Sequence, residues 1–369
     1  MKYWDHLLSR RVFTTMSLGI GAAFTAGIKQ ARALTGIGVL DTPAIPVLNP
    51  AGVSLQVVTL AGSRLVAVGE HGVIIYSDDN AASWKQASVP VDVLLTSVAF
   101  ATPMIGWAAG NFGVILKTED GAKTWQMQLN GIQAAALTLQ AAQTAVAQNF
   151  NSPGTPLALR RANIFVSDGP NKPFTSVFVF DANKVIVFGA SRLTMITTDG
   201  GKTWADWSLH IGDRLSHTLY ASAAIGSSIY VVGEEGLIFC STDGGNSFPP
   251  LNSPTTTTLF GVFGAKDGSV VVYGVAGTAF RSPDAGKTWT AVNINAPDDL
   301  LCAVVLDSGE IVLASEADLF YISQDNGVNF ILVPNAAPGS TFDMVEISNK
   351  QLILAGAGGI VIMPAKDIA

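Results

Sequence analysis

One eight-residue phrase recurs six times along this chain and constrains its fold more than any other feature. The copies read SDDNAASW, TEDGAKTW, TTDGGKTW, STDGGNSF, SPDAGKTW and SQDNGVNF, starting at Ser77, Thr118, Thr197, Ser241, Ser282 and Ser323. Their closing aromatic residues stand at positions 84, 125, 204, 248, 289 and 330, so four of the five steps span 41 or 44 residues. A period near 41 is typical of β-propeller blades, each built from four short strands.

Each repeat contains strand-like runs separated by turns. A run ending in a small residue, such as 105–110, is followed by a Gly-containing turn and a further run, such as 113–118. Such β-branched and aromatic runs, punctuated by Gly, Asp and Asn, indicate strands and turns. Seven of these strand pairs can be counted, beginning near Leu65, Ile105, Val185, Ile229, Val270, Ile311 and Leu352. We therefore expect an all-β fold, a seven-bladed β-propeller.

The last repeat (351–363) has no phrase after it, because the chain ends. We expect its missing fourth strand to come from VLDTPAIPVL (about 39–48), which would join the two ends of the chain. Closure of this kind leaves only short, protected sheet edges. The sequence thus predicts a single propeller over 34–369.

The repeated phrase itself predicts a structural turn. Its first Ser or Thr and its Asp can hydrogen-bond to backbone N–H groups within the turn, and its Gly accepts a positive φ. The closing aromatic can fill the wedge between two blades, burying about 150–250 Å². The residues expected in this role are Asp79 and Trp84, Asp120 and Trp125, Asp199 and Trp204, Asp243 and Phe248, Asp284 and Trp289, and Asp325 and Phe330.

Residues 1–33 predict an export signal. Ser9 to Phe13 (SRRVF) matches the core of the twin-arginine signal, and a weakly apolar, Gly-containing run follows. Ala31-Arg32-Ala33 is a small-x-small cleavage site. The apolar run is short for a membrane span, although a short membrane anchor is an alternative interpretation.

One segment, about 131–170, interrupts the period. Its first part (131–150) is rich in Ala and Gln, and Leu139, Ala142, Val146 and Phe150 fall at roughly helical spacing. NSPGTP then ends the predicted helix, and Arg160-Arg161 follows as the only adjacent arginine pair after the signal. Two interpretations stay open: a helix packed on the ring, or a partner-docking element with Arg160 and Arg161 as charged anchors.

The phrase is the Asp-box. Together with the small-residue strand and the G-x-I/L-x-K/R/S segment before it, it resembles the photosystem II stability/assembly-factor propellers and their bacterial BNR-repeat relatives, over about 52–364. The resemblance implies a non-enzymatic, cofactor-free factor that binds a membrane-protein subunit during maturation. It also implies a periplasmic location, or the thylakoid lumen in a photosynthetic source, and we expect a soluble monomer after signal cleavage.

In those relatives a basic residue just before the box contributes to the partner surface. Lys117 and Arg281 occupy that position here, whereas the other blades have Tyr76, Ile196, Cys240 and Ile322. A role with another membrane assembly, such as a transporter or export system, fits the residues equally well.

Other classes of function are less well supported. The formal net charge of −7 argues against nucleic acid, which requires a basic surface. A sialidase-like hydrolase would need three arginines around a carboxylate and a Tyr–Glu nucleophile pair, and we interpret Glu234-Glu235 as a solvated pair. His71, His210 and His217 show no metal-ligand spacing, and the cluster His210, Asp213 and His217 is interpreted as a loop. We expect no enzyme activity, no metal and no cofactor, with Cys240 and Cys302 as buried thiols.

Overall fold

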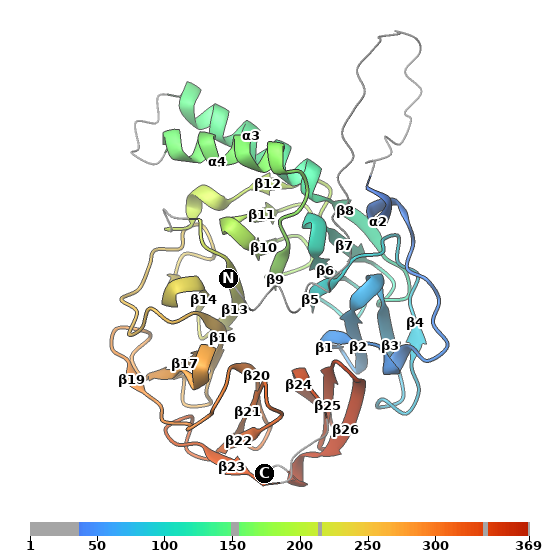
Figure 1. Cartoon of the computed structure of the whole chain (residues 1–369), viewed down its shortest axis with the longest axis vertical. Helices are drawn as coiled ribbons and strands as arrows, with labels where there is room; N and C mark the ends of the chain where they lie inside the picture. Colours follow the sequence, from blue (N-terminus) through green and yellow to red (C-terminus); the bar gives the residue numbers. More distant parts are fainter. Residues whose placement is uncertain (1–36, 149–154, 213–215, 335–338, 368–369) are drawn as a thin grey trace. The chain divides into compact units, whose positions relative to one another are not determined.

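The computed structural model describes residues 37–148, 155–212, 216–334 and 339–367. Within these ranges seven antiparallel sheets stand side by side around one axis (Figure 1). The predicted seven-bladed propeller is therefore confirmed. The predicted export signal (1–33) lies outside the described residues and stays a prediction. None of the described helices combines the length and the apolar character that crossing a bilayer requires.

We number the sheets as blades 1 to 7 in chain order. Blades 1, 2, 3, 5 and 6 have four strands each. Blade 1 has β1 (Leu55–Ala61), β2 (Arg64–Gly69), β3 (Ile74–Ser77) and β4 (Lys85–Gln86); blade 2 has β5 (Leu95–Phe100), β6 (Gly106–Gly110), β7 (Ile115–Thr118) and β8 (Gln126–Leu129); and blade 3 has β9 (Phe174–Val179), β10 (Val185–Gly189), β11 (Thr194–Thr197) and β12 (Ala205–Asp206). Blade 5 has β16 (Leu259–Gly264), β17 (Val270–Gly274), β18 (Ala279–Ser282) and β19 (Thr290–Ala291), and blade 6 has β20 (Leu300–Val305), β21 (Ile311–Ser315), β22 (Phe320–Ser323) and β23 (Ile331–Val333). Blades 4 and 7 have three strands each, namely β13 (Leu219–Ile225), β14 (Ser228–Gly233) and β15 (Ile238–Ser241); and β24 (Thr341–Glu346), β25 (Gln351–Gly356) and β26 (Gly359–Pro364).

The core of the ring lies between blades rather than within them. The second strand of each blade is apolar on both faces, as in β10 and β17, where every residue is buried. Each of the seven hydrophobic clusters combines residues of two neighbouring blades. One cluster joins Leu55 and Ile75 of blade 1 to Ile353 of blade 7. Packing therefore continues around the whole ring.

The ring does not close in the way that the sequence suggested. Blade 7 has three strands, and the segment predicted as its fourth (39–48) starts with a short helix, α2 (Gly38–Asp41). That segment lies against the outer edge of blade 1, where the Ala44 N–H donates to the Val89 carbonyl at 3.0 Å. Pro43 and Pro46 have no N–H to give to a strand ladder, which explains why it does not extend a sheet.

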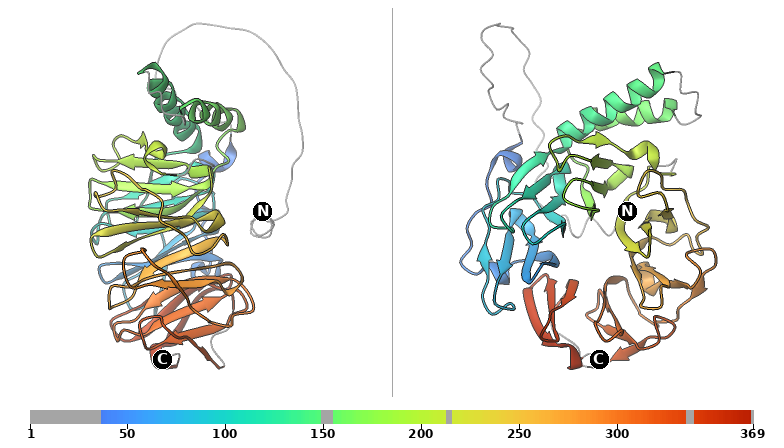
Figure 2. Two further views of the ribbon diagram at one scale, coloured as in Figure 1. Left: turned by 90° about the vertical axis from the view of Figure 1, so that its left-hand side faces the viewer. Right: turned by 180° about the vertical axis from the view of Figure 1, so that it is seen from behind.

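The insertion forms two helices, α3 (Gly131–Ala147) and α4 (Thr155–Asp168), which pack against each other as a hairpin. The hairpin lies outside the rim of the ring, beside blades 2 and 3 (Figure 2). Asn130 caps α3, since its side chain accepts hydrogen bonds from the N–H groups of Ile132 and Gln133. The sequence pattern predicts only one helix in this segment, so α4 corrects that prediction.

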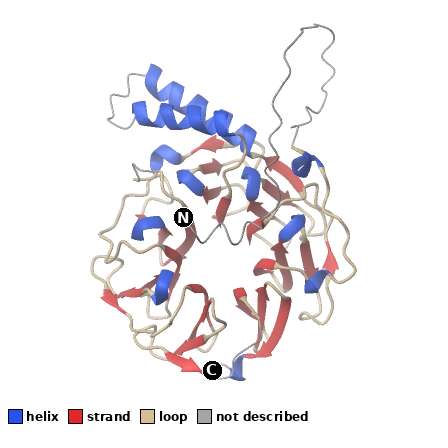
Figure 3. Ribbon diagram, in the orientation of Figure 1, coloured by secondary structure: helices blue, strands red, loops and turns tan. Residues whose placement is uncertain are grey.

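The remaining helices are single 3-10 turns, most of them between the second and third strands of a blade (Figure 3). They are η1 (Pro50–Gly52), η2 (Glu70–Gly72), η3 (Asn111–Gly113), η4 (Ala190–Arg192), η5 (Ser208–His210), η6 (Glu234–Gly236), η7 (Val275–Gly277) and η8 (Ala365–Asp367).

Candidate functional site

The six Asp-boxes share one hydrogen-bonded turn. In blade 2 the Thr118 hydroxyl donates to Asp120 Oδ1 at 2.9 Å and accepts the Ala122 N–H at 3.0 Å. Asp120 also accepts the N–H groups of Lys123 and Thr124 and the Thr124 hydroxyl. The other five aspartates accept the equivalent bonds within their own turns. Each box carboxylate is thus satisfied locally, which suits structure rather than chemistry on a ligand.

The closing aromatic of each box packs on the preceding blade. Trp125 of blade 2 is buried in the cluster that it shares with Val68 of blade 1, and Phe248 of blade 4 lies edge-on to Phe188 of blade 3. Trp84 of blade 1 belongs to the cluster shared with blade 7. The boxes therefore stabilise the contacts between blades.

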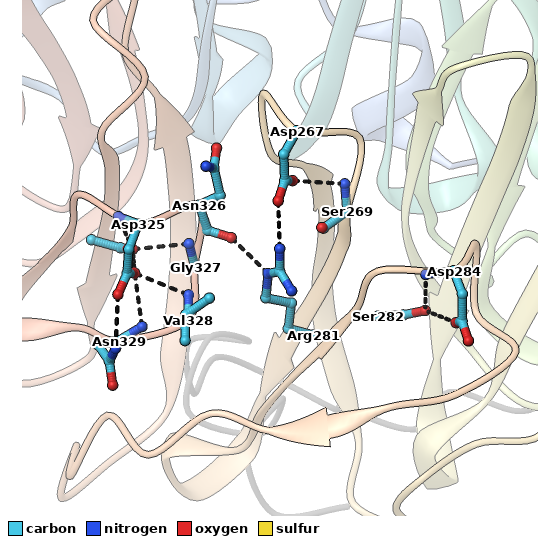
Figure 4. Close-up of polar contacts among 11 residues, drawn as sticks. Asp267, Ser269, Arg281, Ser282, Asp284, Asp325, Asn326, Gly327, Val328 and Asn329 are labelled. Carbon is cyan, nitrogen blue, oxygen red and sulfur yellow. Dashed lines mark hydrogen bonds and ion pairs between the residues drawn. The ribbon is translucent and has the colours of Figure 1, made fainter.

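Arg281 links two blades. Its Nε donates to the Asn326 carbonyl in the box of blade 6 at 2.8 Å, and its guanidinium also pairs with Asp267 of its own blade (Figure 4). Arg64 makes the matching contacts with Asp78 and with the Gly121 carbonyl of the next box. The guanidinium of Arg281, predicted to face a partner, therefore makes intramolecular contacts, and its side chain is only 16% exposed.

Lys117 lies beside a pocket of about 350 Å³ between blades 2 and 3. Gln126 and Gln128 of β8 and Lys202 of the next box also line this pocket. The Lys117 ammonium pairs with Glu119 at 2.5 Å and lies over the Trp107 ring. It therefore borders an open polar pocket, while its own charge already has a partner.

The two adjacent arginines of the insertion have opposite environments. Arg161 is buried under α4, where its guanidinium donates to the hydroxyls of Ser208 at 2.9 Å and Ser216 at 3.2 Å and lies over Phe165. This corrects its expected role as an exposed anchor, because adjacent helix residues point about 100° apart. Arg160, by contrast, is exposed.

Arg160 lies on an apolar outer face of α4. Leu157 and Ile164, one heptad apart, are 48% and 45% exposed, and Arg160 stands between them. Arg160 and Ile164 also line a shallow, mostly apolar hollow on this side of the helix, together with Pro156, Leu159 and Asn163. We call Leu157, Arg160 and Ile164 the α4 face. The two apolar residues were not among the predicted site residues, because the predicted helix of the insertion ends at NSPGTP.

The described residues weighed for catalysis or metal binding do not converge on one centre. Glu234 accepts the Thr218 N–H at 2.7 Å, whereas the neighbouring Glu235 pairs with His217 at 3.2 Å. His210 stacks on Trp207, and His71 pairs with Asp92. Asp213 lies outside the described residues. Across the described ranges no three His, Cys, Asp or Glu side chains come together as a metal site would require.

Comparison with known proteins agrees with this geometry. The family described as photosynthesis system II assembly factor YCF48 matches residues 50–149 and 171–330, so the gap in the match (150–170) contains all of α4. No match was found among curated proteins.

Among solved structures, "YCF48 bound to D1 peptide" is 17% identical with a TM-score of 0.62, covering 86% of this chain and 94% of that one. YCF48 from Cyanidioschyzon merolae is 13% identical with a TM-score of 0.62, covering 87% and 98%. A GH74 xyloglucanase from Xanthomonas campestris is 12% identical with a TM-score of 0.59, covering 85% and 52%. At these identities the structural likeness shows the fold alone.

Proposed function

Because the chain belongs to the family of photosynthesis system II assembly factor YCF48, we propose that it is a non-enzymatic, exported factor that binds a subunit of a membrane-protein complex. The observation that carries this proposal is the family match, which extends from blade 1 to the Asp-box of blade 6. Export rests on the twin-arginine-like segment at 9–13, and it assigns the mature chain to the periplasm, or to the thylakoid lumen in a photosynthetic source.

The chemistry of the bound segment follows from that premise. One family structure is titled as a complex with D1 peptide, which supports a polypeptide segment as the ligand here as well. The satisfied Asp-box carboxylates favour a binding role over hydrolysis, since no box aspartate is left to act as an acid or base.

We place the main contact of this chain on the α4 face. The core of a protein interface is more apolar than the rest of the surface, and arginine is enriched among the residues that dominate binding energy. The α4 helix lies outside the matched family positions, so this contact would be particular to the chain. Lys117 and Arg281 would contribute only where a partner competes with their intramolecular contacts.

Affinity capture of the full chain from membranes of its native host tests the proposal. We expect recovery of one membrane-protein subunit, and a photosystem subunit would extend the family's described role to this chain. Recovery of a transporter or export subunit would favour that alternative membrane assembly. Hydrolysis of a sialoside by the purified chain would contradict the proposal.

Surface variants locate the contact without removing the hairpin. Ala134, Ala135 and Phe165 bury the hairpin against blades 2 and 3, so its deletion would expose core residues. We expect L157S/I164S to reduce recovery by roughly tenfold or more, as loss of an interface anchor does. The matched control is I331S on β23, because Ile331 is 71% exposed and lies on blade 6. Equal recovery with both variants would place the contact elsewhere.

A further inference from the structure

Blade 6 departs from the other blades at the turn between its second and third strands. In the other six blades the second strand ends in glycine: Gly69, Gly110, Gly189, Gly233, Gly274 and Gly356. A Cβ at these glycines would lie only 1.9–2.4 Å from a carbonyl oxygen just before or at the start of the blade's first strand. Blade 6 has Ser315 instead, and three residues later it has Asp318 at φ 60°, where blades 1, 2, 4, 5 and 7 have glycine.

Two further aspartates lie against this turn. Asp298 and Asp299 directly precede β20, and the Asp299 carbonyl accepts the Glu316 N–H at 2.8 Å. The turn is closed by the Asp318 N–H, which donates to the Ser315 carbonyl at 3.1 Å. We call Asp298, Asp299, Ser315 and Asp318 the blade 6 cluster.

The cluster contains buried oxygens that have no hydrogen-bond partner among the described residues. They are Asp298 Oδ1, Asp299 Oδ2, Asp318 Oδ1 and Ser315 Oγ. Ser315 is completely buried and Asp299 is 3% exposed, while the other carboxylate oxygen of Asp299 accepts the Ala276 N–H of blade 5 at 2.8 Å. Unpartnered buried carboxylate oxygens are costly, and a cation that approaches the half-buried Asp298 and Asp318 would offset part of that cost.

The stretch of sequence that contains the cluster is acidic. Between Lys287 and Lys350 the sequence has nine Asp and Glu residues and no Lys, Arg or His. Asp307 and Glu346 pair with Lys350, but among the described residues no cation pairs with an acidic residue of the cluster. Burial and the charge of Asp298 raise the pKa of Asp318, against the opposing Thr341 N–H, as expected of carboxylates without a counter-ion.

We infer that the blade 6 cluster binds a cationic side chain, a lysine ammonium or an arginine guanidinium, of a partner polypeptide. Such a group supplies three to five N–H donors, which suits several separate carboxylate oxygens. A metal ion fits less well, because across the described ranges no three acidic, His or Cys side chains are arranged around one point. This site is distinct from the α4 face and does not depend on which protein the partner is.

Peptide binding to the full chain tests the inference. The probes are two fluorescein-labelled Gly/Ser peptides, one with four arginines and one with four glutamines, followed by fluorescence anisotropy. We expect the arginine peptide to bind and the glutamine peptide not to bind. D298N/D318N should weaken binding by about fivefold or more and reduce its salt dependence. Because these substitutions remove like charges, the melting temperature should not fall.

The matched control is E119Q/E310Q, which also removes two negative charges but from residues outside the cluster. This variant should leave peptide binding unchanged. Equal weakening by the control would reveal non-specific attraction and overturn the inference. The inference would also be overturned if micromolar Ca²⁺ raised the melting temperature of the wild type but not of D298N/D318N, since that would identify a metal site. If the melting temperature of the double variant falls, D298N alone must still weaken binding of the arginine peptide.

Discussion

At the scale of single residues, one carboxylate organises each Asp-box turn. Asp120 accepts two backbone N–H groups and two hydroxyls within seven residues of chain. These bonds hold Gly121 and Ala122 at positive φ, 71° and 72°. A left-handed alanine is unfavourable on its own, so the carboxylate stabilises a conformation that the backbone would not choose.

Replacing Asp120 with alanine should therefore destabilise the ring. D120A leaves the Lys123 and Thr124 N–H groups without their acceptor, and we expect the free energy of unfolding to fall by about 1–3 kcal/mol. Urea unfolding followed by tryptophan fluorescence measures this change, because Trp125 ends the same turn. E119Q is the control, since Glu119 is exposed and pairs only with Lys117. An equal loss in both variants would mean that charge, rather than the turn, is responsible.

At the scale of elements, a cation of one blade often reaches the box of the next. Arg64, Lys184 and Arg281 donate to the carbonyls of Gly121, Gly244 and Asn326, which all occupy the fourth position of their boxes. The Lys184 bond measures 2.7 Å. These contacts repeat around the ring and couple neighbouring sheets that share no strand ladder.

Replacing Arg281 with methionine separates its structural role from a partner role. R281M keeps an apolar stem but loses the bonds to Asn326 and Asp267, so we expect a loss of about 1 kcal/mol in unfolding free energy. R64M should cost a similar amount, and the two losses should add because the residues lie in blades 1 and 5. Recovery of the membrane partner should stay unchanged in R281M. If R281M lost the membrane partner but kept its unfolding free energy, Arg281 would be part of the binding surface.

Local sequence patterns predict the turns and the blades, but not contacts between residues far apart in the chain. The Asp-box turns follow from residue types within eight positions, and the blades follow from their 41-residue period. The burial of Arg161 depends on Ser208 and Ser216, which lie 47 and 55 residues away, so no local pattern reveals it. The α4 helix was missed because the Pro-containing NSPGTP was taken as the end of all helix. The last two residues of that stretch instead begin a second helix, with Pro156 in the first turn of α4, where proline is tolerated.

At the scale of the whole molecule, ring closure was the least predictable feature, because it joins residues nearly 300 positions apart. The Asp343 side chain of β24 accepts the Val58 N–H of β1 at 3.0 Å and links the last blade to the first. Ser97 makes the same kind of bond from blade 2 to Val177 of blade 3. Asp343 thus places a carboxylate where blade 2 has a neutral hydroxyl.

The carboxylate of Asp343 at this position should make the free energy of unfolding of the ring depend on pH. Burial raises the pKa of Asp343 to about 7, against the opposing N–H groups of Val58 and Met344. The folded chain therefore binds this proton more tightly than the unfolded chain, whose Asp titrates near pH 4. Between about pH 4 and pH 7 the Asp343 contribution to the unfolding free energy falls as the pH rises. The box aspartates act in the opposite direction. The bonds within their turns lower the pKa of Asp79 and Asp199 to about 2, so their contribution is lost only as the pH falls from about 4 towards 2.

The D343N variant isolates the contribution of the closure. An asparagine oxygen can still accept the Val58 N–H but carries no charge to bury, so D343N should match the wild type at pH 4. At pH 8 it should be more stable by about 1–3 kcal/mol. Urea unfolding of both proteins at intervals from pH 4 to pH 8 measures the difference. S97A is the control, because it removes the equivalent neutral bond and should shift stability equally at every pH. Parallel curves for D343N and the wild type would show that Asp343 keeps its proton affinity on unfolding, and that the closure has no dependence on pH.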